Sequence, residues 1–420
     1  MSKQSPFRLA LLPVLAMVLA VSATPSRGAE EGVEAARLDA FTHTDGANYF
    51  ALSLKPAVDV APAKAHDLVV LFDTSASQAG DYRAGGLEAL KSLLGGLSPE
   101  DRVQLVAVDV NAVALTENFV APESQEVADA LAKLEARVPL GATDMEKAIT
   151  AAVARYADGG SNGRAVIYIG DGMSTANLVG TETFEQLVGS LVDNRIAVSS
   201  YPIGPRLDVQ VLGSLAANTG GQLVDAAEGD AEQAGSQLAA AAKGAVLWPD
   251  SVTWPAGFSE VFPARTPPLR TDRETVILGT YKGEGPFDVQ MTADTAAGSK
   301  SLSWKVQPNP PQDSNNYIAQ LVESARLDGG MNLPLVGSAS LQEAERAASS
   351  GLRQVTQLAV EALKSGDLDS AERLAGEALR KDAEDMEARI VASAVERRRA
   401  SGPAAGPEPP ADLTLVGPAA

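Results

Sequence analysis

Residues 68–81 read LVVLFDTSASQAGD, and the apolar run at their start leads directly into Asp73, Ser75 and Ser77. A continuous apolar run of this length is typical of a β-strand buried on both faces, as in the parallel sheet of an α/β domain. The three oxygen-bearing side chains stand at positions i, i+2 and i+4. This spacing fits either a polar turn or half of a metal site, and the pattern elsewhere in the chain has to distinguish the two.

From Asp67 to about Asp225, apolar segments alternate with segments of helical periodicity. The expected strands are residues 67–72, 102–110, 164–172, 196–204 and 222–226, with 112–119 as a short edge strand. The expected helices are residues 82–97, 124–138, 143–157, 181–195 and 209–221. Such alternation is the pattern of a mostly parallel sheet with helices on both faces. The sequence therefore predicts an α/β domain with a doubly wound, mostly parallel sheet over residues 67–227.

The stretches on either side of this domain have a different character. Residues 246–308 carry Trp and many Pro residues together with several alternating segments, which predicts a small antiparallel β-sandwich. The segment NYFALSLKP, which contains Phe50, alternates in the same way. We therefore expect residues 40–60 to complete the sandwich, with the α/β domain inserted between its strands.

Residues 315–400 have the periodicity of helices. Ala371, Leu374 and Ala378 form an apolar stripe, and Gly366-Asp367 is the expected turn between two helices. The pattern resembles one tetratricopeptide repeat, and a plain helical hairpin fits it equally well. Residues 401–420 are rich in Pro and Ala, which predicts a disordered tail.

The composition disfavours several classes of function. The chain has 420 residues, no Cys and only two His, so thiolate metal sites and Cys nucleophiles are excluded and His-based triads are strongly disfavoured. The net charge of −20 disfavours nucleic acid as a partner, because phosphate binding requires clustered Lys and Arg.

Residues 1–23 have the pattern of a secretory signal peptide. Lys3 and Arg8 precede the apolar core LALLPVLAMVLAV, and the small residues Val21-Ser22-Ala23 provide a cleavage site. The alternative is an uncleaved anchor helix. We expect a secreted or periplasmic protein of the cell envelope, attached to a membrane only if the signal segment is retained.

Two further oxygen-bearing side chains stand at expected loops of the α/β domain. Thr143 precedes a helix in LGATDMEKA, and Asp171 follows a strand in IYIGDGMST. Because loops at the carboxyl ends of the strands converge in an open α/β sheet, these two residues can meet residues 73–77 at one edge. A set of oxygen donors favours Mg²⁺, Mn²⁺ or Ca²⁺. The alternative is a set of turn and capping residues without a metal.

The elements Asp73-x-Ser75-x-Ser77, Thr143 and Asp171-Gly172 stand in the order found in the von Willebrand factor type A domain, and they resemble its metal-ion-dependent adhesion site. The resemblance covers residues 67–225. It implies that the two Ser and the Thr supply neutral hydroxyls to a divalent cation, which the two Asp hold partly through water. It also implies that a partner protein contributes an Asp or Glu to the cation.

A looser resemblance concerns the segment that follows this domain. Residues 261–293, VFPARTPPLRTDRETVILGTYKGEGPFDVQMTA, resemble the corresponding part of bacterial proteins similar to inter-alpha-trypsin-inhibitor heavy chains. The amino-terminal domain of those proteins is reduced here to the strand near Phe50. For this reason the resemblance does not extend to a role specific to heavy chains.

These observations predict an exported, metal-dependent protein-binding module that serves in adhesion or assembly. We expect no enzymatic activity, because the five candidate ligands include no His, Lys or Cys that would act as base or nucleophile beside a metal. The alternative is a structural scaffold of the envelope with a vestigial metal site. A scaffold of that kind would bind no metal.

Overall fold

The computed structural model describes residues 36–56, 58, 60–157, 159–224, 230–381 and 385–400. The expected signal segment 1–23 and the expected tail 401–420 lie outside these residues. The described part contains a five-stranded sheet and two four-stranded sheets, together with helices that pack against them.

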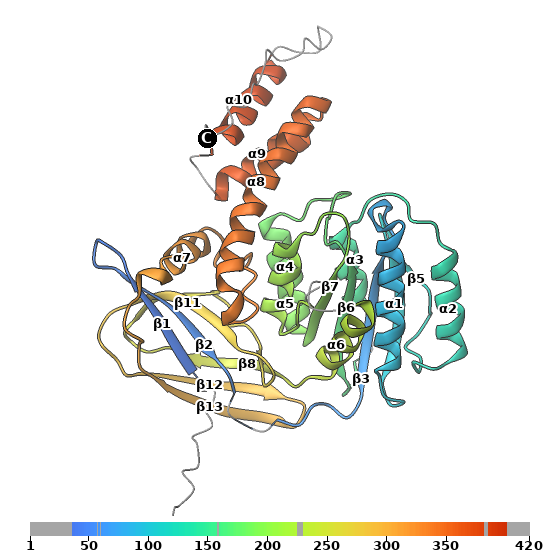
Figure 1. Cartoon of the computed structure of the whole chain (residues 1–420), viewed down its shortest axis with the longest axis horizontal. Coiled ribbons are helices and arrows are strands. Elements are labelled where there is room, and N and C mark those ends of the chain that lie inside the picture. The colour runs from blue at the N-terminus through green and yellow to red at the C-terminus, as the bar shows by residue number, and fades with distance from the viewer. Residues whose placement is uncertain are drawn as a thin grey trace, which may run out of the picture. The chain divides into compact units, whose positions relative to one another are not determined.

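The five-stranded sheet forms the centre of residues 66–224. Its strands are β3 (His66–Asp73), β4 (Arg102–Val108), β5 (Ala112–Ala114), β6 (Gly163–Gly170) and β7 (Ile196–Pro202). Their order is β5-β4-β3-β6-β7, in which β5 is an antiparallel edge strand and the other four are parallel. Helices lie on both faces of this sheet (Figure 1). The predicted doubly wound α/β fold is therefore confirmed.

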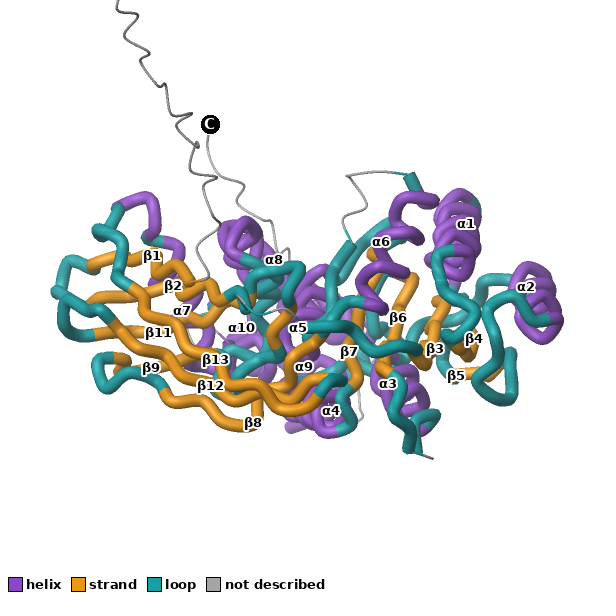
Figure 2. Tube along the Cα trace, turned by 90° about the horizontal axis from the view of Figure 1, so that it is seen from below, coloured by secondary structure: helices purple, strands orange, loops and turns teal. Residues whose placement is uncertain are grey.

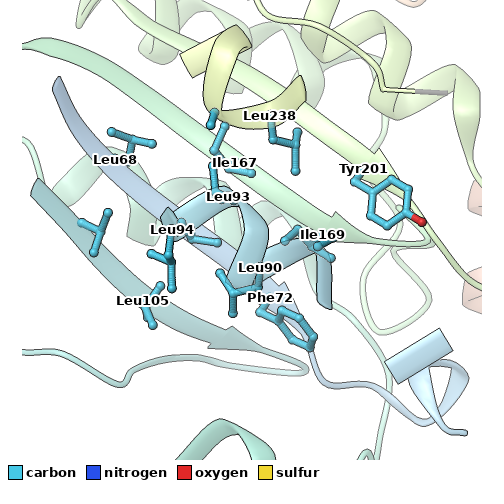
Figure 3. Close-up of a cluster of buried hydrophobic side chains, with 14 of the residues drawn as sticks. Leu68, Phe72, Leu90, Leu93, Leu94, Leu105, Ile167, Ile169, Tyr201 and Leu238 are labelled. Carbon is cyan, nitrogen blue, oxygen red and sulfur yellow. The ribbon is translucent and has the colours of Figure 1, made fainter. Parts of the chain in front are cut away.

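Alternation along β3 explains why both faces are covered. Successive side chains of a strand point to opposite faces, so Leu68, Val70 and Phe72 pack on one side and Val69 and Leu71 on the other. The first side is covered by α1 (Asp81–Gly95), α2 (Gln125–Ala136) and α6 (Ala231–Lys243). The second side is covered by α3 (Met145–Ala154), α4 (Thr181–Asp193) and α5 (Val209–Thr219). Figure 3 shows side chains of β3, α1 and α6 in the first of these two cores.

Two local features differ from the sequence prediction. Helix α6 was not expected, because its buried face consists largely of Ala and gives a weak apolar signal. It packs closely on α1, since a Cβ at Gly235 would lie 2.2 Å from the carbonyl oxygen of Ala89. The strand expected at 222–226 is limited to a single bridge between Leu223 and Ser200. Residues 225 and 226 of that segment lie outside the described part.

The two four-stranded sheets form a sandwich around one apolar core. Their strands are β1 (Ala36–Thr42), β2 (Asn48–Leu54), β8 (Val246–Thr253), β9 (Phe258–Phe262), β10 (Leu269–Arg270), β11 (Thr275–Tyr281), β12 (Phe287–Thr295) and β13 (Gly298–Val306). The orders are β1-β2-β11-β9 and β10-β8-β12-β13. Figure 2 shows the strands of the first sheet side by side. As expected from the sequence, the strand that contains Phe50 pairs with the region after the α/β domain, because β2 runs antiparallel to β11. The strand β1, which pairs with β2, was not expected as a separate element.

A buried arginine joins the sandwich to the end of the α/β domain. The Arg270 side chain is completely buried, and its Nη1 donates to the carbonyl oxygens of Gly220 and Ala241, each at 3.1 Å. These carbonyls stand at the carboxyl ends of α5 and α6, where helices have unpaired acceptors and a partial negative charge. Asp272 accepts from the same guanidinium at 2.7 and 2.6 Å. Arg270 thereby fixes two helix ends to the strand β10.

The carboxyl-terminal part of the described chain is helical, as expected. It comprises α7 (Tyr317–Asp328), α8 (Leu341–Ser365), α9 (Leu368–Lys381) and α10 (Met386–Ala400). Leu374 and Ala378 of α9 are buried, and Gly366, with φ of 85°, stands in the turn after α8. A left-handed φ of this kind favours Gly at the end of a helix. Among the described residues, no helix has the length and apolar character needed to cross a membrane.

Candidate metal centre

The carboxyl end of β3 is shaped by Asp73 and its surrounding backbone. Asp73 Oδ1 accepts from the backbone N–H of Ser75 at 2.8 Å, which turns the chain sharply after the strand. The loop before Thr143 lies against this turn. The Leu140 N–H donates to the Thr74 carbonyl and the Ala76 N–H donates to the Gly141 carbonyl, both at 3.0 Å. Backbone pairing therefore brings a segment almost seventy residues away in sequence to the end of β3.

The five residues predicted from the sequence meet in one cluster. Thr143 Oγ1 donates to Asp73, lying 3.1 Å from Oδ1 and 2.9 Å from Oδ2. The hydroxyl oxygens of Ser75 and Ser77 are 2.9 Å apart, and Ser77 Oγ donates to Asp171 Oδ2 at 2.5 Å. Oxygens from three loops thus converge above the ends of β3 and β6, as the sequence spacing implied.

Close packing of backbone holds the two carboxylates in place. A Cβ at Gly170 would lie 2.4 Å from Cβ of Asp73, and one at Gly204 would lie 2.6 Å from Cβ of Asp171. Asp171 Oδ1 also accepts from the Met173 N–H at 2.9 Å, in the same kind of turn that Asp73 makes. Any side chain at either glycine would displace a carboxylate of the site.

The charges of this cluster are not balanced by protein cations. Asp73 is fully buried and Asp171 is 2% exposed. Their hydrogen-bond donors are hydroxyls and backbone N–H groups, and within the described residues no Lys, Arg or His pairs with either one. Burial, together with the negative charge of Asp171, raises the pKa of Asp73 above its usual value. Burying two carboxylates without a counter-ion lowers the stability of the fold unless a cation binds beside them.

Tyr168 is a member of this site that the sequence analysis missed. Its hydroxyl donates to Asp73 Oδ2 at 2.8 Å and accepts from the Gly172 N–H at 3.3 Å. Burial and the nearby carboxylates raise the pKa of Tyr168 well above its usual value, so the phenol stays a donor. In the sequence, Tyr168 reads as one more apolar residue of β6, and only the strand register brings it under Asp73.

Arg137 is a second residue that was not anticipated. Its guanidinium donates to Asp109 Oδ2 at 2.5 Å and to Thr74 Oγ1 at 3.1 Å. These contacts tie the start of the Thr143 loop to the ends of β3 and β4. Asp144, in contrast, caps α3, because its side chain accepts from the Lys147 N–H.

The donor set fits a hard divalent cation. The hydroxyls of Ser75, Ser77 and Thr143 and the carboxylates of Asp73 and Asp171 offer only oxygen, which suits Mg²⁺, Mn²⁺ or Ca²⁺. Nowhere in the described ranges do three or more His, Asp or Glu side chains gather as a metal site. A cation held here would therefore face two carboxylates, and its remaining donors would be neutral.

Comparison with known proteins finds a family model that matches part of the chain. Residues 66–225 match the model of the von Willebrand factor type A domain. No curated protein matches the chain.

Two solved structures are similar over most of the chain. A von Willebrand factor type A protein from Catenulispora acidiphila is 16% identical, with a TM-score of 0.46, and the match covers 83% of this chain and 84% of the other. The ArnB paralog VWA2 from Sulfolobus acidocaldarius is 14% identical, with a TM-score of 0.41 and coverage of 86% and 97%.

Proposed function

We propose that this protein is a metal-dependent protein-binding module. The observation that carries the proposal is the pair of buried carboxylates, Asp73 and Asp171, which have three hydroxyls and no basic side chain among their contacts in the described chain. When bound, a divalent cation would supply the missing positive charge. Ser75, Ser77 and Thr143 would present neutral oxygens to it. The carboxylates would orient the hydroxyls of Ser77 and Thr143 through the hydrogen bonds they already accept from them.

The mode of binding follows from this charge balance. Few carboxylates beside a divalent cation leave residual positive charge at the surface of the domain. That charge favours an Asp or Glu from a partner, and the resulting contact is strong where water is partly excluded. The partner is therefore a protein that exposes a carboxylate. Adhesion or assembly in the cell envelope is the setting that agrees with the secretory pattern of residues 1–23.

We also propose that the site performs no catalysis. A metal-assisted hydrolase needs a base or an activated nucleophile beside the metal. Lys147 is the basic residue closest in sequence to Thr143, and its Nζ is already engaged by Asp144 Oδ2 at 3.1 Å and the Val110 carbonyl at 3.2 Å. The hydroxyls of Ser77 and Thr143 likewise donate to carboxylates.

Calorimetric titration of the full chain with Mg²⁺ and Mn²⁺ tests this proposal. The wild-type protein should bind one cation, and Asp73→Ala should abolish binding while the far-UV circular dichroism stays unchanged. Ser75→Ala and Thr143→Ala should weaken binding less, because each removes one neutral donor. Asp193→Ala is the matched control, since that carboxylate is exposed and paired with Arg265 away from the cluster.

Absence of heat with either cation, or unchanged binding by Asp73→Ala, would contradict the proposal. A chain that folds normally and binds no divalent cation would instead be a scaffold with a vestigial site.

A further inference from the structure

Exposed apolar side chains surround the candidate metal centre. Five large apolar residues on its bordering loops are exposed to solvent: Val110 at 42%, Val138 at 77%, Leu140 at 73%, Leu207 at 37% and Val209 at 37%. We call these five residues the apolar rim. Single exposed apolar residues are common on protein surfaces, but several around one polar centre mark an interaction surface.

Contacts place Leu140, Val110 and the segment 207–209 of the rim next to residues of the metal centre. Leu140 donates its N–H to the Thr74 carbonyl, between Asp73 and Ser75. Val110 lies against the same loop, since a Cβ at Gly141 would be 4.0 Å from Val110 Cγ1. On the opposite side, the Asp208 N–H, between Leu207 and Val209, donates to the Asp171 carbonyl at 2.8 Å. The rim therefore borders the centre from at least two sides.

This arrangement restricts the chemistry of the ligand. A carboxylate alone would pair with the residual charge of the cation and leave the rim exposed to water. A segment in which bulky apolar residues follow the acidic residue would both bind the cation and cover the rim. Interfaces commonly combine a polar anchor with buried apolar contacts in this way. The matching ligand is therefore an Asp or Glu within a short apolar segment.

The chain itself contains such a segment. In residues 401–420, SGPAAGPEPPADLTLVGPAA, the charged residues are Glu408 and Asp412, and neither Lys nor Arg occurs. The bulky apolar residues Leu413, Leu415 and Val416 all follow Asp412 directly, whereas Glu408 stands among Pro residues. We propose that the segment 412–416 of the same chain is a tethered ligand, with Asp412 at the metal centre and its apolar neighbours on the rim. This inference rests on the proposed function of the centre.

A series of contacts links the end of α10 to the loop that follows Asp171. The side chain of Arg399, near the end of α10, donates to Asp369 Oδ1, near the start of α9. Four residues further along α9, about 6 Å at 1.5 Å per residue, Arg373 donates to the Leu178 carbonyl. Leu178 belongs to the loop after Asp171, in which the Ala176 N–H donates to the Thr143 carbonyl. The eleven residues 401–411 can span up to about 36 Å, so the segment 412–416 is not confined to the end of α10.

A competition experiment on the full chain tests the proposal. A fluorescent peptide of residues 405–420 is titrated with wild-type protein, Asp412→Asn and Glu408→Gln in Mg²⁺, and binding is followed by anisotropy. Asp412→Asn should bind the peptide at least about tenfold more tightly than the other two, because a tethered ligand competes at a millimolar effective concentration. Chelation should abolish binding in every case.

The role of the rim is tested in the Asp412→Asn background. Leu140→Ser should weaken peptide binding by about tenfold, which corresponds to the loss of about 1.4 kcal/mol of apolar burial. Leu327→Ser is the matched control, because Leu327 is 53% exposed on α7 and does not belong to the rim. Equal effects of the two substitutions would overturn the assignment of the rim.

The remaining outcomes separate this inference from the proposed function. If Asp412→Asn binds Mg²⁺ in calorimetry but no peptide, the tethered ligand is wrong and the proposed function stands. If no variant binds Mg²⁺, the proposed function fails first. Mg²⁺-dependent dimers of the wild type that disappear in Asp412→Asn would overturn the tethered contact in favour of a contact between two copies.

Discussion

The buried carboxylates at the two ends of strand β3 differ in their hydrogen-bond donors. At the amino end, Asp67 accepts two hydrogen bonds from Arg102, at 2.8 and 2.7 Å, and Asp101 accepts from His66 and Ser98. At the carboxyl end, the donors to Asp73 within the described residues are all neutral. Arg102 therefore supplies a positive charge at the amino end, and among the described residues no basic side chain does so at the carboxyl end.

This difference suggests separate roles for the two ends. We call Asp101 the structural carboxylate, because it stabilises the fold, and Asp73 the functional carboxylate, because we propose that it holds a cation. A buried charge with several strong donors stabilises the fold, and its loss leaves those donors unsatisfied. A buried carboxylate whose donors are all neutral keeps an uncompensated negative charge. A cation that binds beside it would stabilise that charge.

Removing the structural carboxylate should give the largest effect. Asp101→Ala leaves the donors from Ser98 and His66 without their acceptor, and we expect a loss of about 3 kcal/mol in the free energy of unfolding. Urea denaturation followed by circular dichroism measures this loss. The control is Glu100→Ala, because Glu100 is the exposed neighbour. A loss below about 1 kcal/mol would show that the amino end is not held as the hydrogen bonds suggest.

Removing the functional carboxylate, Asp73, should change stability little without a cation and should remove the stabilisation by Mg²⁺. In chelator, Asp73→Asn should unfold within about 1 kcal/mol of wild type, because the substitution removes an uncompensated buried charge and keeps the shape. With Mg²⁺ at about 100 times its dissociation constant, wild type should gain about 2.7 kcal/mol and the variant nothing. The same urea titration in the two buffers measures both. A large loss in chelator would make Asp73 a structural residue like Asp101.

The contribution of Asp101 to stability should depend on pH. Burial by itself would raise the pKa of Asp101, but the hydrogen bonds from Ser98 and His66 outweigh it and hold that pKa below its usual value. Its stabilisation is therefore complete above about pH 4, the usual value for Asp, and is lost as pH falls through the lowered pKa. Wild type should lose its advantage over Asp101→Asn only in that acidic range. An advantage that shrinks instead between pH 5 and 8 would contradict this origin.

The smallest effect should come from the buried phenol beneath the centre. Tyr168→Phe removes the donor to Asp73 Oδ2 and leaves the rest of the side chain in its apolar surroundings. We expect about tenfold weaker Mg²⁺ binding, as is usual for a partner that orients a metal ligand. Calorimetry measures the affinity, and Tyr156→Phe is the control, because that buried phenol bonds only to backbone near the amino end. Equal losses in both variants would indicate a general effect on folding.

Much of the fold could be predicted from residue patterns because those patterns are local. The apolar run before Asp73 and the alternation of strands with helices are properties of short windows, and they were sufficient for the doubly wound sheet. Helix α6 escaped prediction because a face of Ala residues buries little area per residue. The strand β1 was missed because its pairing with β2 depends on a partner in space and not on its own composition.

For the candidate metal centre, too, some features follow from local sequence and others only from contacts in space. The sequence alone determined its chemical identity, because Asp73, Ser75, Ser77, Thr143 and Asp171 can be named from their positions after strands and before a helix. It could not determine that, among the described residues, no basic side chain would pair with Asp73 or Asp171, nor that Tyr168 would donate to Asp73. Those facts depend on contacts between segments far apart in the chain. Tertiary structure alone decided them, because the cost of a buried charge is set by everything that surrounds it in space.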